Sequence, residues 1–141
     1  MIREAGISDL SLLTDLAGRL WPDHDRQELE SELGEILKRE DAAFFLAGDG
    51  EGFAQCQLRR DYVEGTESSP VGYLEGIYVE ENCRRRGLAA ALLAACEDWA
   101  RTKGCREFAS DCELTNSQSL RFHLALGFEE ANWIICFTKK L

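Results

Sequence analysis

The sequence predicts a single α/β domain in which helices flank a mixed β-sheet. Short apolar segments that suit strands alternate along the chain with amphipathic segments that suit helices. The order is rich in strands, and two of them are separated by a glycine-rich turn. The length of 141 residues suits one domain, residues 1–141, whose core needs no metal or disulfide bond for stability.

The first forty residues are predicted to form a short strand at 2–3 and then two helices. Ser8 is expected to cap the first helix, which ends at Trp21-Pro22 because a residue before proline avoids helical geometry. The segment Asp25-Arg26-Gln27-Glu28 resembles a capping box and predicts the start of a second helix. The apolar face of that helix consists of Leu29, Leu33, Ile36 and Leu37.

The middle of the chain is predicted to be mostly strands. Residues 42–47 form an apolar strand, 48–52 have the composition of a hairpin turn, and 53–58 pair back antiparallel. A polar loop at 61–70 then leads to a longer strand at 71–79.

The pattern Arg84-x-x-Gly87-x-Ala89 follows this strand and leads into an alanine-rich helix. The first N–H groups of a helix have no carbonyl partner, and the helix dipole adds about half a positive charge there. A phosphate group placed at that end is therefore bound by the main chain, with Arg84, Arg85 and Arg86 as a dense positive cluster beside it. The pattern lacks the Gly-Lys-Ser/Thr of a Walker loop and the further glycines of a dinucleotide fingerprint.

The remaining elements are a helix, a strand, a helix and a strand. The helix that starts at Gly87 is expected to end at Gly104, where glycine suits a C-terminus. A strand is predicted at 105–111, a helix from Asn116 to Gly127, and a final strand at about 132–138.

Charge and cysteine content exclude several classes of partner. The net charge is −10, and residues 1–70 carry sixteen acids against seven bases, which opposes nucleic acid and anionic membranes and favours a polycationic partner. Acidic helices that only keep the protein in solution are the alternative. The six cysteines form no Cys-x-x-Cys pair and only two histidines are present, so no metal site is expected. No leader-like or membrane-spanning stretch is seen, and we expect a cytoplasmic protein.

Two motifs resemble those of the GCN5-related N-acetyltransferase (GNAT) superfamily. One is the Arg84-x-x-Gly87-x-Ala89 loop, and the other is Asn116 followed by Phe122-His123 and Gly127-Phe128. The resemblance implies the GNAT fold, a mixed, mostly antiparallel twisted sheet of six to seven strands flanked by about four helices. Other segments resemble one bacterial subgroup, the aminoglycoside 6′-N-acetyltransferases: Leu20-Trp21-Pro22, Asp61-Tyr62-Val63, Ser68-Ser69-Pro70, Leu74-Glu75-Gly76-Ile77, Lys103-Gly104-Cys105-Arg106-Glu107, Ala109-Ser110-Asp111 and Ala125-Leu126-Gly127-Phe128-Glu129-Glu130.

The resemblance implies direct acetyl transfer from acetyl-coenzyme A to the 6′-amine of a cationic aminoglycoside. Pantetheine would pair with the strand that ends at Val79, and pyrophosphate would meet the N–H groups after it. The implied cofactor contacts are Ile77, Tyr78, Val79, Arg84, Arg85, Arg86, Gly87, Leu88, Ala89 and Asn116. The family often forms homodimers, sometimes by exchanging C-terminal strands, and the apolar segment 133–137 suits either such an interface or a monomer core.

The chemistry requires a neutral amine held at a thioester and a route for its protons. We expect Asp111 to contact the reacting amine and Glu75 to bind substrate or to relay a proton through water, a division of roles that the resemblance leaves open. Trp21 and Tyr62 are expected to cover the apolar face of a sugar, or else to lie in the core. No metal takes part.

His123 stands where the superfamily has a tyrosine that protonates the departing thiolate. Histidine suits that role at neutral pH, but a helix histidine is often structural, and the thiolate can leave without a protein acid. An acyl-enzyme on Cys112 is disfavoured by its acidic neighbours Asp111 and Glu113.

Two other functions are compatible with this sequence. The first is acetylation of a different amine, such as a polyamine or a protein amino group. The second is a non-catalytic sensor of acyl-coenzyme A, which the presence of both Glu75 and Asp111 argues against.

Overall fold

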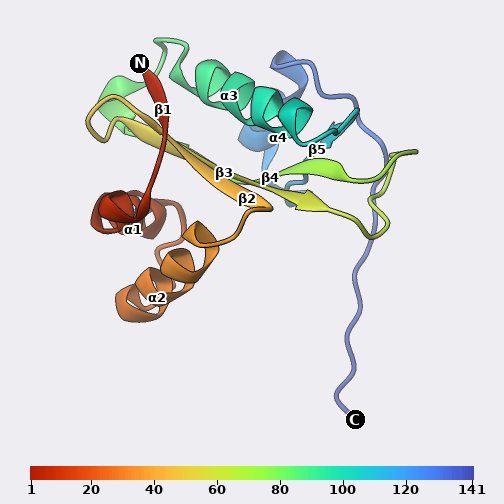
Figure 1. Cartoon of the computed structure of the whole chain (residues 1–141). Helices are drawn as coiled ribbons and strands as arrows, with labels where there is room; N and C mark the ends of the chain where they lie inside the picture. Colours follow the sequence, from red (N-terminus) through yellow and green to blue (C-terminus); the bar gives the residue numbers. More distant parts are fainter.

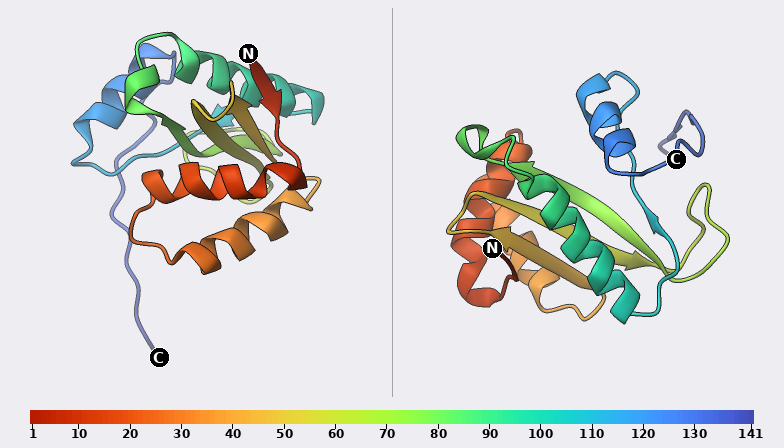
Figure 2. Two further views of the ribbon diagram at one scale, coloured as in Figure 1. Left: turned by 90° about the vertical axis from the view of Figure 1, so that its left-hand side faces the viewer. Right: turned by 90° about the horizontal axis from the view of Figure 1, so that it is seen from above.

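A computed structural model describes residues 1–141 as a five-stranded sheet between two layers of helices (Figure 1; Figure 2). Two short 3-10 turns, η1 (Ile7–Asp9) and η2 (Glu81–Cys83), precede α1 and α3. The regular elements in chain order are β1 (Ile2–Glu4), α1 (Leu10–Leu20), α2 (Arg26–Leu37), β2 (Ala42–Ala47), β3 (Gly52–Arg59), β4 (Val71–Val79), α3 (Leu88–Thr102), β5 (Phe108–Ala109) and α4 (Ser117–Ala125).

The strands lie in the order β1-β2-β3-β4-β5, and the first four are antiparallel. β5 runs parallel to β4 and pairs with it only at Gly72–Phe108 and Tyr73–Ala109. From Leu74 to Val79, β4 therefore has a partner strand on its β3 side alone. This stretch is called the open edge of β4 below.

Each face of the sheet has its own apolar core. Phe44, Leu46 and Phe53 pack with leucines of α1 and α2 on one face. On the other face, alanines and cysteines of the strands pack with α3 through Leu92 and Cys96. Full burial of one such large side chain contributes about 1.5–3 kcal/mol, so the two cores fix β2, β3 and β4 between the helices.

Most predicted elements are confirmed. β2 and β4 have the predicted bounds, because an apolar run between turn residues is a strong strand signal. Asp25 caps α2 by accepting from the Glu28 N–H at 3.1 Å. Gly87 precedes α3 in the left-handed region, with φ of 77°.

The predicted cap at Ser8 is wrong. Ser8 lies inside η1, and Asp9 is the residue that precedes α1. The Asp9 carboxylate accepts from the Gly6 N–H at 2.9 Å and from the Arg3 guanidinium at 2.7 and 2.9 Å. These bonds stabilise an extra turn before the helix, which moves its start past Ser8.

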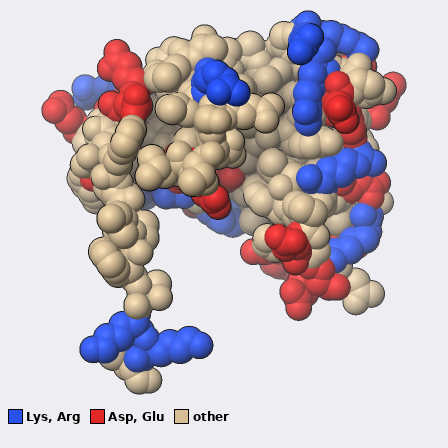
Figure 3. Space-filling model, turned by 180° about the vertical axis from the view of Figure 1, so that it is seen from behind, with Lys and Arg blue, Asp and Glu red and all other residues tan.

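The C-terminal strands are overpredicted. The strand expected at 105–111 is reduced to two residues, no strand forms at 132–138, and the sheet has five strands instead of six to seven. The tail stands away from the body (Figure 1). Two basic side chains, Lys139 and Lys140, lie just before its last residue, Leu141 (Figure 3). Its apolar side chains Trp133, Ile134, Ile135 and Phe137 are 65–86% exposed, so within one chain no surface pairs with them.

None of the helices combines the length and the apolarity that crossing a bilayer would need. No three His, Cys, Asp or Glu side chains are grouped as they would be to hold a metal ion. All six cysteines are free thiols, and only Cys112 and Cys136 are exposed.

Candidate active site

Glu75 lies at an irregularity in the centre of the sheet. In the pairing of β3 with β4, Gln55 is opposite Gly76 and Cys56 is opposite Leu74, so Glu75 has no partner on β3. A β-bulge of this kind bends the strand and redirects the side chain of the extra residue. The apolar sequence of β4 is interrupted at this residue by a carboxylate.

A chain of contacts connects Glu75 with Asp111. The Arg59 guanidinium, at the end of β3, donates to Glu75, with Nη2 3.0 Å from both carboxylate oxygens and Nε 3.3 Å from Oε2. The same guanidinium lies 3.4 Å from the centroid of the Tyr73 ring. The Tyr73 hydroxyl in turn donates to Oδ2 of Asp111. One cation and one phenol thus link the two predicted carboxylates.

In this series of contacts, the Tyr73 hydroxyl is always a hydrogen-bond donor. Its burial first, and the Asp111 carboxylate second, raise the pKa of Tyr73 well above its ordinary value. The phenol therefore stays protonated and keeps Oδ2 of Asp111 occupied. Oδ1 of Asp111 is the oxygen left to accept from another donor.

Trp21 packs beside the bulge. A Cβ added to Gly76 would lie 2.7 Å from Cζ2 of Trp21, so glycine is required for this close approach of ring and strand. The indole also meets the ring of Phe53 nearly edge-on, with centroids 6.2 Å apart. Trp21 is half-buried, so it is partly core and partly accessible beside the residue that follows Glu75.

Tyr62 lies on the surface, with 78% of its area exposed. Its hydroxyl donates to Oε2 of Glu64 at 2.9 Å, and Oε1 of Glu64 accepts from Nδ2 of Asn132 at 3.2 Å. These contacts connect the loop at 61–70 with the start of the tail. Tyr62 and Glu64 thus form an acidic and aromatic surface, and Tyr62 does not lie in the core.

Glu107 holds the other end of the same loop. Its Oε1 accepts from the Ser68 hydroxyl and from the Glu67 N–H, the latter at 2.9 Å. These bonds, the Ser68 bond first, hold the pKa of the Glu107 carboxyl below its ordinary value. The carboxylate just before β5 thus fixes a loop far away in the sequence.

His123 is fully bonded. Its Nδ1 lies 2.7 Å from the Ser119 carbonyl oxygen, which only accepts, and its Nε2 lies 2.8 Å from the Ser110 hydroxyl. A neutral ring that donates through Nδ1 and accepts at Nε2 satisfies both partners. The ring also meets Phe122 and Phe128 edge-on, with centroids 5.2 and 5.0 Å apart. His123 therefore ties α4 to the residue before Asp111.

The start of α3 has the geometry of an anion site. Its first backbone bond runs from the Ala91 N–H to the Gly87 carbonyl at 3.0 Å, so the N–H groups from Gly87 to Ala90 have no acceptor within the helix. Arg85 and Gly87 both have positive φ, 65° and 77°, in the turn that leads to these groups. No atom lies within 4 Å of a Cβ placed on Gly87, which leaves space for a ligand.

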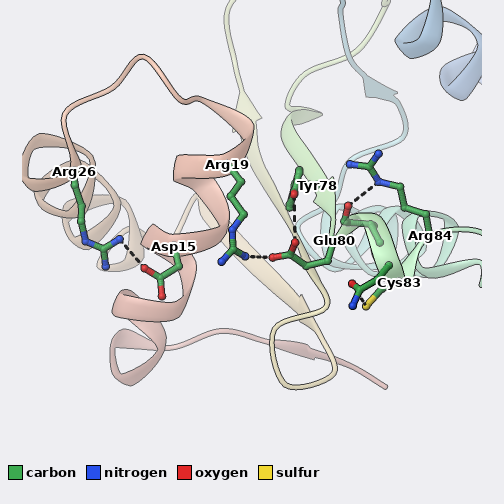
Figure 4. A network of polar contacts seen from close by, with 9 residues as sticks. Asp15, Arg19, Arg26, Tyr78, Glu80, Cys83 and Arg84 are labelled. Atoms are coloured by element: carbon green, nitrogen blue, oxygen red, sulfur yellow. Dashed lines mark hydrogen bonds and ion pairs between the residues drawn. The ribbon is translucent and has the colours of Figure 1, made fainter.

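The side chain of Arg84, the first arginine of the loop, makes structural contacts (Figure 4). Nε of Arg84 donates to the Val79 carbonyl at 2.9 Å, and its guanidinium lies 5.8 Å from the Tyr78 ring centroid. The Tyr78 hydroxyl donates to Glu80 at 3.3 Å, and Glu80 forms an ion pair with Arg19 of α1. These contacts fasten the end of β4 to α1 and set the direction of the loop.

Two more predicted cofactor residues have partners. Arg86 donates to the Asn82 carbonyl at 3.3 Å and lies 3.8 Å from Glu51, with 57% of its side chain exposed. Asn116 caps α4, because its Oδ1 accepts from the Ser119 N–H at 3.0 Å. Its Nδ2 is left for another acceptor.

Sequence reasoning missed Arg59, Tyr73 and Glu107. The spacing of Tyr73 and Glu75 was a usable signal, because residues two apart on a strand share a face. The contact of both with Arg59 depends on the bulge, which shifts the pairing of β3 and β4 and has no clear sequence signature.

The family model for the acetyltransferase (GNAT) family matches residues 10–128. An aminoglycoside N(6′)-acetyltransferase type 1 of Stenotrophomonas maltophilia is 46% identical, over 99% of this chain and 93% of that protein. A solved structure of AAC(6′)-Iy with the bisubstrate analogue CoA-S-monomethyl-acetylneamine has a TM-score of 0.95 and 41% identity, over 100% of this chain and 98% of that one. AAC(6′)-Iy in complex with CoA has a TM-score of 0.96 and 42% identity, over 100% and 95%.

Proposed function

The chain belongs to the acetyltransferase (GNAT) family, and we propose that it acetylates the 6′-amine of aminoglycoside antibiotics, with acetyl-coenzyme A as donor. The observation that carries the proposal is the linked pair of carboxylates, Glu75 and Asp111, beside the open edge of β4. Whole-length similarity to proteins of that activity supports it. The product would be an antibiotic with one cation fewer.

The residues present fit acetyl-coenzyme A. Pantetheine would pair with the open edge of β4 as an added strand does, along Ile77, Tyr78 and Val79. Successive residues of a strand direct their main-chain groups to opposite edges, and the Val79 carbonyl already accepts from Arg84, so only part of these groups would bond the donor. The free N–H groups at the start of α3 suit pyrophosphate, with the exposed guanidinium of Arg86 and that of Arg85 nearby. Arg84 would contribute through its main chain, since its Nε is already bonded.

The bound donor supplies the acetyl thioester: a carbon–nitrogen bond forms as the carbon–sulfur bond breaks, sulfur keeps that electron pair, and the ammonium loses two protons in becoming an amide. Asp111 would accept a hydrogen bond from the reacting amine through Oδ1, since Tyr73 occupies Oδ2. Glu75 would bind the amino-sugar or pass a proton to water. Trp21 and Tyr62 would cover the sugar, and Cys112 takes no part in this direct transfer.

His123 has a positioning role in this scheme. It would hold Ser110, and so the strand end that carries Asp111. To act as general acid for the thiolate it would first have to release the Ser110 hydroxyl and gain a proton. That role stays a prediction.

A homodimer is part of the proposal. The exposed apolar tail, residues 133–137, suits burial against a second copy of the chain, since so many large apolar side chains rarely stay in water. Location in the cytoplasm, where acetyl-coenzyme A and reduced thiols are found, fits the six free cysteines.

The test is release of coenzyme A, detected with a thiol reagent, from purified protein with acetyl-coenzyme A and kanamycin. Its counterpart with a 6′-hydroxyl in place of the 6′-amine is the matched control. Turnover of kanamycin alone would establish both reaction and position. Equal turnover of the two would refute the 6′ position, and turnover of a polyamine but neither antibiotic would favour another amine. Binding of acetyl-coenzyme A without any turnover would leave a sensor.

A further inference from the structure

Arg59 is a fixed cation at the candidate site. Its guanidinium bonds both oxygens of Glu75, and a guanidinium held in this planar way is more rigid than a lysine ammonium. It also covers the face of Tyr73, a buried ring, at 3.4 Å from the centroid. Two independent contacts therefore hold the charge in place.

A fixed cation matters because acetyl transfer needs an amine without its proton. A carboxylate that binds an ammonium group also stabilises its charged form, which leaves less of the reactive neutral amine. Glu75 and Asp111 together would do this strongly. A guanidinium a few ångströms away acts in the opposite direction, and the effect is larger in a partly dehydrated site than in water.

Arg59 is the cation that offsets the charge of Glu75, because the nearby arginines Arg39 and Arg60 face Asp41 instead. Arg39, after α2, also feels the charge of Glu75, but its Nε bonds Asp41 at 2.8 Å. Arg60 faces the same Asp41 at 4.0 Å. The Asp111 carboxylate is reached from Arg59 only through the neutral Tyr73 hydroxyl.

We infer that Arg59 is a positioning residue that orients Glu75 and offsets its charge, so that the bound amine loses its proton at neutral pH. The inference rests on the proposed function and deepens it. Arg59 thus weakens binding of the ammonium form of the substrate, but it speeds acetylation because more of the bound amine is neutral. Binding and turnover should therefore respond to its removal in opposite directions.

The test is Arg59→Gln in the full chain, with the first-turnover rate at saturating acetyl-coenzyme A and kanamycin measured against pH. We expect the midpoint of the rate profile to rise by about one pH unit and the rate at neutral pH to fall about tenfold, since one charge a few ångströms away shifts a pKa by this much. The KM for kanamycin should stay equal or fall, because the site becomes more acidic.

Three controls separate the outcomes. Arg60→Gln removes the same charge beside Asp41 and should leave the midpoint in place. Arg59→Lys keeps the charge and should restore the midpoint, and thermal unfolding checks that each variant is folded. A slower rate with a higher KM and an unmoved midpoint, or an equal shift in Arg60→Gln, would overturn the inference alone. A wild-type protein that acetylates no amine would overturn the proposed function and the inference with it.

Discussion

Residues 1–105 and residues 106–141 are held together in different ways. The N-terminal region, residues 1–105, contains all 29 buried residues, and the C-terminal region, residues 106–141, contains none. The C-terminal region is attached by half-buried rings such as Phe108 and Phe128 and by polar bonds from Asp111 and Glu107. Glu75 therefore lies in a packed frame, whereas Asp111 is placed by a few specific contacts.

The difference teaches that the candidate site joins a fully packed region to one that is held by few buried contacts. An active site tolerates little misplacement of its groups, so the polar bonds between the two regions matter more for reaction than for stability. We expect the changes below, from the largest effect to the smallest, to test this contrast.

Asp111→Asn and Glu75→Gln should each lower kcat/KM for kanamycin by about 10²–10⁴-fold, the usual contribution of a group that handles protons. Coenzyme A release measures both. Glu113→Gln, an exposed acid near Asp111, is the matched control and should change little. Near-normal turnover by Asp111→Asn would show that only the N-terminal region supplies reacting groups.

Leu92→Ala, in the N-terminal region, should lower the free energy of unfolding by about 2–5 kcal/mol, because it leaves a cavity under α3. Leu114→Ala, in the C-terminal region, removes a side chain that is 73% exposed and should change it by less than about 0.5 kcal/mol. Urea unfolding compares the two. Equal losses would mean that the C-terminal region belongs to the same core.

Removal of residues 133–141 should convert the proposed dimer into a monomer, since this segment contains the exposed apolar tail, residues 133–137. Sedimentation should then report the 15.9 kDa full chain at twice its mass and the shortened chain at once its mass. A full-length monomer would contradict the proposed dimer. A dimer that survives the deletion would move the interface elsewhere.

Asp9→Asn should give a small effect, and one that depends on pH. The Arg3 side chain first, and then the Gly6 N–H, lower the pKa of Asp9 from 3.8 to about 2. A lowered native pKa stabilises the fold above the ordinary pKa, and this contribution is lost as pH falls through the native value. Urea unfolding should therefore separate Asp9→Asn from wild type at neutral pH, with a gap that closes on acidification.

Glu107→Gln is the counterpart of Asp9→Asn in the C-terminal region. The Glu107 carboxyl also has a lowered pKa in the native state, because it accepts from Ser68 and from the Glu67 N–H. Since these bonds hold only the loop at 61–70, Glu107→Gln should lower the free energy of unfolding at neutral pH less than Asp9→Asn does, with a gap that also closes on acidification. A gap as large as that of Asp9→Asn would show that this loop unfolds together with the core.

The sequence predicted the N-terminal region well because its signals are local. Apolar runs bounded by turn residues defined β2 and β4, the Asp25 cap defined α2, and Gly87 defined the start of α3. The two motifs pointed to the GNAT family, which the family match over 10–128 confirms. Glu75 and Asp111 were named from the same resemblance, and two sets of hydrogen bonds joined by a cation–π contact connect them in the structure.

The failures occurred where structure depends on partners. The segment 132–138 has the composition of a strand, but a strand needs a neighbour to pair with, and this exposed segment pairs with no strand of the chain. Ser8 is a good capping residue, yet the Asp9 bonds to Arg3 moved the start of the helix. Arg59 could not be found because its contacts follow from a bulge.

The open edge of β4 should affect how long the protein persists in a cell. A strand edge without a partner strand is a template on which strands of other chains can add, and this is a route to aggregation. A co-substrate that covers this edge would act as a molecular shield, and by mass action it would also raise the stability of the native state. Starved cells with little acetyl-coenzyme A should therefore lose this protein faster than well-fed ones.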